Sequence, residues 1–474
     1  MTGEGIAYDL DIFRYEDGTS RILGLWDQTI TNAEEEEIAN HGNTADDMPF
    51  PFAYGTSWNQ EQLNQALKLE NPYEIVPSRD EDGHGTFLAG IAAGRPDAAN
   101  DFTGMAPDAA LAVVKLRQAK QYLKDYNYVD NSVNAYSEID ILNAVKYLLI
   151  LARYYHKPLV ICIGLGTNQG GHDGKMPLSQ YLSDISNSPS VAVVQAAGNE
   201  GNARRHYQGE TSPDLVDTIE IKVGPRTKGF VMEIWSSVLS SVYIGLQSPS
   251  GDRIAPTIYR TNEVRKYPFP LDGSNVYVYD RLVKMQESDY LVMLRFETPA
   301  EGIWRVLVAN QGSFRTDYHS WMPIQQFLNE ETYFLQSSPY TTLVSNASAA
   351  NAITAGMYDH LQDSVTPESS KGFTRTGQIK PDILAPGVNV YGPNTNGRYT
   401  RKTGSSIAAA HTAGAAALVM EYAAVRGNYT YIDGADIRTM MIRSARRNPA
   451  IVYPNETYGY GFLDIYQLFL NQTL

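Results

Sequence analysis

Two short strings each place a potentially reactive side chain at the start of a helix-like run of small residues. His84 lies in residues 82–90, which read DGHGTFLAG, and Ser406 lies in residues 404–414, which read GSSIAAAHTAG. A serine at a helix start gains backbone N–H groups and the positive end of the helix dipole, which favour developing negative charge. A histidine can take the hydroxyl proton as general base. The ordered pair predicts nucleophilic catalysis by Ser406 with His84.

Each string also has a simpler interpretation. Ser406 could be an ordinary helix N-cap, and His84 a structural histidine beside a glycine turn. Ser405 is the rival nucleophile, but the spacing to His411 and Gly414 favours Ser406. The simpler interpretations explain one string at a time, whereas catalysis explains both.

A third string, AAGNEG at residues 196–201, directly follows a predicted strand at Val191–Gln195. Its Asn199 side-chain amide, at a strand end in a glycine-rich turn, can donate a hydrogen bond to an oxyanion. Losing such a donor costs about 10²–10³ in turnover. Alone, the string is also typical of a simple turn.

Short apolar runs alternate with helical periodicity in the first 200 residues. A helix is predicted over Glu138–Tyr155, where apolar residues recur at helical spacing and Lys157-Pro158 follows. This alternation predicts a parallel sheet with helices on both faces. The buried strands expected in it are Arg21–Trp26, Ala110–Leu116, Leu159–Ile163 and Val191–Gln195.

The sequence pattern changes between Asp214 and Met322, where runs of β-branched and aromatic residues are separated by residues typical of turns. We expect an inserted antiparallel β module, a sandwich or jelly roll. The alternation of predicted strands and helices then resumes, with a long helix predicted over Ile407–Ala424. The predicted domains are a first α/β part at 1–205, the β module at 206–340 and a second α/β part at 341–474.

Composition limits the partners. The 474 residues carry a net charge of −15, which argues against nucleic acid and anionic membrane surfaces. No run approaches the roughly 18 apolar residues of a membrane span. The single cysteine, Cys162, excludes an intramolecular disulfide and is expected to be buried. The first six residues show no secretory signal, so we expect cytoplasmic synthesis, with secretion only if a leader precedes residue 1.

The chain resembles the subtilisin-like serine proteases (subtilases), with His84, Asn199 and Ser406 in the order of that family. The resemblance implies a subtilisin-like α/β fold, and it implies that Leu165, Gly166 and Thr167 line the primary specificity pocket and pair with substrate backbone. Calcium is common in the family, but no site is identified here, because the acidic run Glu34–Glu37 is expected to be a solvated helix face. Further matching segments are Gly104–Ala109, Ser369–Gly372, Lys380–Gly387 and Tyr458–Asp464.

More narrowly, Arg21–Ile30, Asn71–Ser78 and the β insertion resemble the clostridial germination proteases (the Csp group). That resemblance implies a jelly-roll insertion, association with the spore, a propeptide as partner and the processing of a spore cortex-lytic zymogen. Some members of the group are pseudoproteases. The chain departs from the family at Ala410, usually proline, at Ser405, usually threonine, and at Gly164, usually serine.

The triad acid is the main open question. The family expects Asp-Thr/Ser-Gly at the end of the first core strand, and no such triplet precedes His84. Asp27, at the end of the strand Arg21–Trp26, is the positional candidate to orient His84. In the germination group, however, the acid strand comes earlier, where Gly3–Phe13 stands with about ten residues absent, and Asp9 or Asp11 would be the substitute. The third possibility is that there is no acid.

We therefore predict a serine endopeptidase that acts on a protein or peptide substrate. Ser406 is the nucleophile, His84 the general base and Asn199 the oxyanion donor. The alternative is a catalytically inactive subtilase-fold protein that acts in binding or signalling, because loss of the acid can lower turnover by ~10⁴.

Overall fold

The computed structural model describes residues 2–30, 50–237, 242–257, 263–284, 288–310, 312–429 and 431–473. The run Glu34–Glu37 lies outside these ranges. Most of the predicted strands and helices are present, with ends that differ by a few residues. No helix in the described ranges is both long and apolar enough to cross a membrane.

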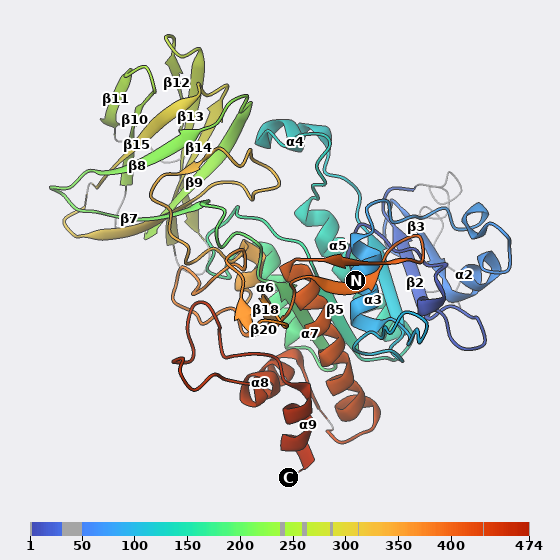
Figure 1. The fold of residues 1–474 in the computed structure, drawn as a ribbon. Helices are drawn as coiled ribbons and strands as arrows, with labels where there is room; N and C mark the ends of the chain where they lie inside the picture. Colours follow the sequence, from blue (N-terminus) through green and yellow to red (C-terminus); the bar gives the residue numbers. More distant parts are fainter. Residues whose placement is uncertain are drawn as a thin grey trace.

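A mostly parallel sheet forms the centre of the α/β part (Figure 1). Its strand order is β19-β18-β6-β5-β1-β4-β2-β3, with β20 beside β18. The pairs β2–β3 and β18–β19 are antiparallel, at the two edges. The strands are β1 (Thr2–Gly3), β2 (Ile22–Asp27), β3 (Thr56–Asn59), β4 (Leu111–Lys115), β5 (Leu159–Ile163), β6 (Val191–Ala196), β18 (Ile353–Asp359), β19 (Ser364–Val365) and β20 (Ile383–Pro386).

Helices cover both faces of this sheet, as predicted, because its central strands carry apolar side chains in both directions. On β6, Ala192 and Val194 pack in the cluster that holds α7, whereas Val191 and Val193 pack with α5 and α6. The helices in the described ranges are α2 (Gln60–Ala66), α3 (His84–Ala93), α4 (Gln121–Asn127), α5 (Glu138–Tyr154), α6 (Pro177–Ser186), α7 (Ser405–Met420), α8 (Gly434–Ser444) and α9 (Ile465–Thr473).

Helices α3 and α7 lie side by side and carry the two predicted reactive residues at their starts. A hairpin of β21 (Val390–Pro393) and β22 (Tyr399–Lys402) leads into α7. The predicted helix over 407–424 begins two residues earlier than expected, at Ser405, and Glu421–Val425 continues it as a wider π-helical turn. Small residues allow the close packing: a Cβ atom at Gly414 of α7 would overlap the carbonyl oxygen of Ala92 in α3, and also Met105 Cβ.

The β insertion consists of two antiparallel sheets that lie to one side of the α/β part (Figure 1). Their facing side chains form one apolar core that includes Ile219, Met232 and Trp304. One sheet has the order β11-β10-β15-β8-β17 and the other β12-β13-β14-β9-β16-β7. The strands are β7 (His206–Thr211), β8 (Asp217–Val223), β9 (Gly229–Ser237), β10 (Val242–Gln247), β11 (Arg253–Thr257), β12 (Val264–Phe269), β13 (Ser274–Lys284), β14 (Ser288–Glu297), β15 (Gly302–Asn310), β16 (Thr316–Trp321) and β17 (Tyr333–Phe334).

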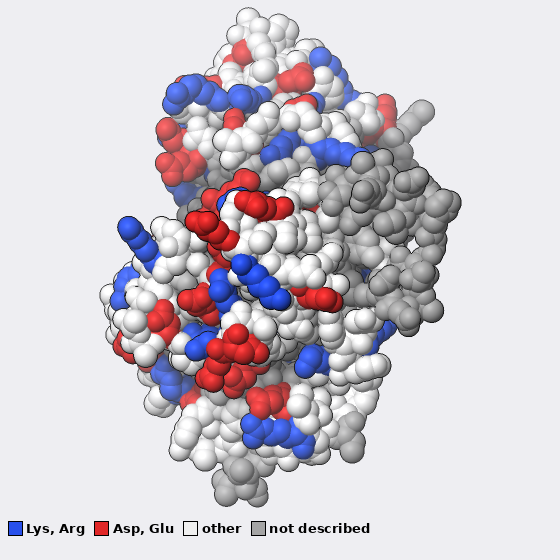
Figure 2. Space-filling model, turned by 90° about the vertical axis from the view of Figure 1, so that its right-hand side faces the viewer, with Lys and Arg blue, Asp and Glu red and all other residues white. Residues whose placement is uncertain are grey.

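The surface shown in Figure 2 carries acidic and basic side chains intermingled, not separated by sign. The excess of acidic residues therefore does not form a continuous patch on this face. The predicted domain limits at residues 205 and 340 stay a prediction.

A buried ion-pair network holds the segment that begins β20. Lys380 and Asp382 are almost fully buried, and Lys380 Nζ lies 2.6 Å from Asp382 Oδ2. Arg438 Nε donates to Asp382 Oδ1 at 2.6 Å, and the Thr354 N–H donates to Oδ2. Burial lowers the pKa of Lys380 to about 8, against the opposing charge of Asp382.

Asp382→Asn should lower the free energy of unfolding by about 3–5 kcal/mol, because it leaves Lys380 as an uncompensated buried charge. Urea denaturation measures the change. The exposed pair Arg446–Asp363 provides the control, since Asp363→Asn should cost about 0–1 kcal/mol. Equal losses in the free energy of unfolding in Asp382→Asn and Asp363→Asn would contradict the stabilising role given to the buried network.

Candidate active site

His84 is the first residue of α3, and carboxylates satisfy the free N–H groups of this helix start. Asp80 accepts from the backbone N–H groups of Gly83 and Thr86, and Asp82 accepts from the N–H of His84 at 2.7 Å. Gly83, with φ of 76°, turns the chain into the helix. These bonds fix the backbone from which the imidazole projects.

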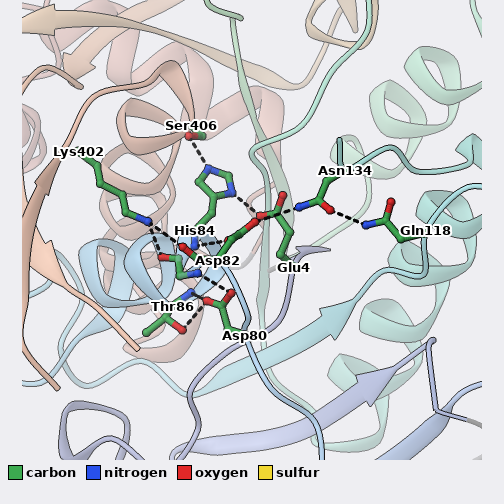
Figure 3. Close-up of polar contacts among 10 residues, drawn as sticks. Glu4, Asp80, Asp82, His84, Thr86, Gln118, Asn134, Lys402 and Ser406 are labelled. Atoms are coloured by element: carbon green, nitrogen blue, oxygen red, sulfur yellow. Dashed lines mark hydrogen bonds and ion pairs between the residues drawn. The ribbon is translucent and has the colours of Figure 1, made fainter. Parts of the chain in front are cut away.

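The His84 ring lies between a hydroxyl and a carboxylate (Figure 3). Nε2 lies 2.9 Å from Ser406 Oγ, and Nδ1 lies 2.7 Å from Glu4 Oε2. The Ser406 side chain sits at the start of α7 and is 7% exposed, so its hydroxyl is reachable but largely shielded. With Nδ1–H donating to Glu4, Nε2 is free to accept the hydroxyl proton.

Glu4 reaches His84 because the N-terminal segment occupies the centre of the sheet. β1 pairs in parallel with β4 and β5, and Glu4 follows it directly. A Cβ atom at Gly85 would overlap the Gly5 carbonyl oxygen, so the first turn of α3 and this segment are in direct backbone contact. The Ala7 N–H donates to Thr86 Oγ1 at 2.9 Å, which ties the segment to α3. Burial and the nearby charge of Glu4 raise the pKa of Tyr136.

The structure does not bring Asp27 to His84, and this corrects the expected position of the acid. Asp27 is fully buried at the end of β2, where Oδ1 accepts from the backbone and hydroxyl of Thr29, and Oδ2 accepts from the Ser78 hydroxyl at 2.7 Å. Lys115 Nζ lies 3.8 Å from Oδ2. The Asp27 carboxylate is thus engaged in tying β2 to the turns around it.

Asp9 and Asp11 do not meet His84 either. Asp9 Oδ1 accepts from the Tyr73 hydroxyl at 2.7 Å. The carboxylate of Asp11 is exposed, and its Oδ1 lies 3.4 Å from Arg14 Nη1. The carboxylate that does lie beside His84 belongs to Glu4, which falls in the segment Gly3–Phe13 of the earlier register but is a glutamate and not one of the two expected aspartates.

Opposing influences act on the His84 imidazole. Burial lowers its pKa, but the hydrogen bond and charge of Glu4, with the charge of Asp82, outweigh burial and raise the pKa above its ordinary value. Lys402 opposes this rise weakly. A raised pKa makes the imidazole a better acceptor for the serine proton.

Asn199 and Ser405 fix the geometry of the turn that carries Ser406. Asn199 Oδ1 accepts from the Ser405 N–H at 2.9 Å, and Ser405 Oγ accepts from the Gly198 N–H at 3.1 Å. A Cβ atom at Gly404 would lie 3.3 Å from Ser406 Oγ and 4.0 Å from Asn199 Nδ2. The Asn199 amide, the Ser406 N–H and the Ser406 hydroxyl therefore border one space, while the Ser405 hydroxyl is engaged elsewhere.

The segment Gly164–Thr167 continues β5 past the nucleophile. A Cβ atom at Gly164 would lie 3.0 Å from Ser406 Cβ and 3.7 Å from His84 Cε1. The Leu165 carbonyl accepts from Asn346 Nδ2, and the Thr167 carbonyl accepts from the Ser345 N–H at 2.7 Å. Gly164 therefore lies beside Ser406, and Leu165–Thr167 lead from it toward Ser345 and Asn346.

Glu200, next to Asn199, was not singled out in the sequence. Its side chain is buried and accepts a hydrogen bond from the backbone N–H of Gln325. The side-chain amide of Gln325 donates in turn to the Asn199 carbonyl oxygen at 3.0 Å. Burial raises the pKa of Glu200 to about 7, although Arg205 opposes the rise. A glutamate in a glycine-rich turn is expected to be exposed to solvent, so no signal in the sequence indicated that Glu200 is buried.

Within the described ranges, no three or more His, Cys, Asp or Glu side chains gather so that they could hold a metal ion.

A family model described as the subtilase family matches residues 26–224 and 329–461 of this chain. Among solved structures, the Clostridium perfringens CspB protease superposes with a TM-score of 0.86 at 28% identity, covering 100% of this chain and 93% of that one. The mouse and human membrane-bound transcription factor site-1 proteases are 30% identical over 132 residues, 27% of this chain. The chain matches only 12% of their length.

Asp27→Asn should destabilise the protein while leaving the nucleophile reactive. The variant removes a buried charge that accepts three hydrogen bonds, and we expect a loss of about 1–3 kcal/mol in the free energy of unfolding. Urea denaturation gives the loss, and the rate of Ser406 labelling by a small fluorophosphonate gives the reactivity. If the labelling rate of folded Asp27→Asn fell by orders of magnitude, Asp27 would be needed for the reactivity of Ser406, which contradicts this prediction.

Glu200 should make the folded state less stable as pH rises. Its folded pKa of about 7 lies above the ordinary 4.5, so the folded state holds the proton more tightly than the unfolded state. Stability from this group is complete below about pH 4.5, declines by on the order of 3 kcal/mol as pH rises to about 7, and then levels off. Glu200→Gln should flatten the decline in denaturation measured across this range. If the free energy of unfolding declined equally with pH in the wild type and in Glu200→Gln, this prediction would be wrong.

Proposed function

This chain belongs to the subtilase family, and we propose that it is a serine endopeptidase with the triad Ser406, His84 and Glu4. The observation that carries the proposal is the single line of hydrogen bonds from the Ser406 hydroxyl through His84 to the Glu4 carboxylate, at 2.9 and 2.7 Å. Both distances lie within the range required between nucleophile and base, and between base and orienting group.

The reaction follows from these positions. His84 Nε2 takes the proton of Ser406 as its oxygen attacks the carbonyl carbon of the scissile bond, and the carbonyl oxygen becomes an oxyanion. The Ser406 N–H and the Asn199 side-chain amide stabilise that charge. His84 then gives the proton to the departing amine, and water releases the acyl group by the same steps in reverse order.

Glu4 takes the role that aspartate has in related triads. A glutamate carboxylate has the same charge and acceptor atoms, with one additional methylene, and its position after the short β1 provides the contact. It holds the imidazole in the tautomer with a free Nε2 and stabilises the imidazolium that forms. The absence of an Asp-Thr/Ser-Gly string therefore does not require an inactive protein.

The substrate is a protein or peptide. The structural match to a Csp protease over the whole chain supports a clostridial-type germination protease, so a spore cortex-lytic zymogen is the substrate to test first. The segment Leu165–Thr167, which follows Gly164 beside Ser406, would pair with the substrate chain.

Ser406→Ala should abolish covalent labelling by a fluorophosphonate, because the reagent requires an activated serine oxygen. Mass spectrometry should locate the label of the wild-type protein on Ser406. Ser405→Ala is the matched control and should retain the label. An unlabelled wild type, under conditions that label an active subtilase, would favour the catalytically inactive alternative.

Glu4→Gln should lower kcat by ~10⁴ at neutral pH, because the base loses its orienting charge. Removing the Glu4 charge also lowers the pKa of His84, so the acidic limb of the pH profile of kcat/KM should move to lower pH. Glu4→Asp, which keeps the charge, is the control and should retain more activity than Glu4→Gln. An unchanged acidic limb in Glu4→Gln would show that Glu4 does not act on His84.

A further inference from the structure

Val344 is wedged between the two backbone segments that flank the nucleophile. These are Gly164–Thr167, after β5, and Ala197–Asn199, after β6. The Val344 N–H donates to the Ala197 carbonyl at 2.9 Å, and the following N–H of Ser345 donates to the Thr167 carbonyl at 2.7 Å. The chain at Val344 thus bridges both segments.

The isopropyl group fills the space that two glycines leave. A Cβ atom at Gly166 would overlap Val344 Cγ2, and one at Gly198 would lie 2.8 Å from Cγ1. The Val344 side chain is 5% exposed and packs in a small apolar cluster with Ala197, Ile324, Leu343 and Ala347. Branching at Cβ restricts χ1, and the packing of this cluster leaves the isopropyl group little room to turn aside.

The proposed reaction fixes what enters this region. The carbonyl carbon must lie at Ser406 Oγ with its oxygen toward the Asn199 amide, and the substrate chain runs along Leu165–Thr167. In this pose the side chain of the residue before the scissile bond (P1) would point between Gly164–Thr167 and Ala197–Asn199, because Gly164 borders Ser406 and the Asn199 amide borders the same space. Val344 is the group that it meets there.

We propose that Val344 makes this subsite shallow and restricts cleavage to bonds that follow a small residue, glycine, alanine or serine. The inference rests on the proposed function, since it assumes attack by Ser406. Bulky P1 side chains are excluded sterically: each carbon beyond the space available costs about 10–200-fold in kcat/KM. Alanine should therefore exceed phenylalanine at P1 by at least ~10²-fold.

Diphenyl phosphonate probes that carry an alanine, leucine or phenylalanine side chain test the proposal, because they label the reactive serine and differ only at P1. In the wild type, we expect the alanine probe to label Ser406 at least ~10²-fold faster than the phenylalanine probe. Val344→Gly, and more mildly Val344→Ala, should raise the labelling rates of the leucine and phenylalanine probes relative to that of the alanine probe at least ~10-fold.

Two further measurements separate the possible failures. Val306→Ala, in the buried core of the β module, is the control for general loosening and should leave the order of the three probes unchanged. A wild type labelled as fast by the phenylalanine probe as by the alanine probe refutes this inference alone, as does an unchanged order in folded Val344→Ala. If a small fluorophosphonate without a side chain also fails to label Ser406, the proposed function is refuted, and this inference with it.

Discussion

The hydrogen bond between Glu4 and His84 Nδ1 is the interaction on which the chemistry of this site depends. It selects the imidazole tautomer whose Nε2 can accept the Ser406 proton, and it supplies the charge that offsets the cost of burying an imidazolium. The other parts of the site, the oxyanion donors and the nucleophile turn, can be complete without it, but they would then surround an unactivated hydroxyl.

Close backbone approach is the constraint that allows this bond. β1 has only two residues, and it is held between β4 and β5 by parallel pairing. Gly5 and Gly85 then meet without side chains between them, which carries Glu4 to the imidazole. Gly164 and Gly404 play the same part around Ser406. Where two such glycines, Gly166 and Gly198, face each other, Val344 fills the space, so the packing that assembles the site also shapes its subsite.

Much of this architecture could be predicted, because periodicity and small-residue strings reflect it directly. The runs at Leu159–Ile163 and Val191–Gln195 are buried strands, the β insertion is a pair of antiparallel sheets, and the contact between His84 and Ser406 is present. The proposed acid, Glu4, could not be found in this way, since a two-residue strand has no periodicity and a single glutamate has no distinctive neighbours. Asp27 was expected instead because it ends a recognisable strand, yet a carboxylate at a strand end can equally tie turns together. Glu200 and Val344 were missed because their burial arises from segments far apart in the sequence.

The proton NMR signal of the hydrogen-bonded His84 Nδ1–H tests the central claim most directly, because an imidazole N–H held by a carboxylate resonates far downfield of ordinary amide protons. We expect this signal in wild-type protein and in Asp27→Asn, and its loss from the downfield region in Glu4→Gln. A downfield signal that persists in Glu4→Gln, or that disappears in folded Asp27→Asn, would contradict the assignment of Glu4 as the residue that orients His84.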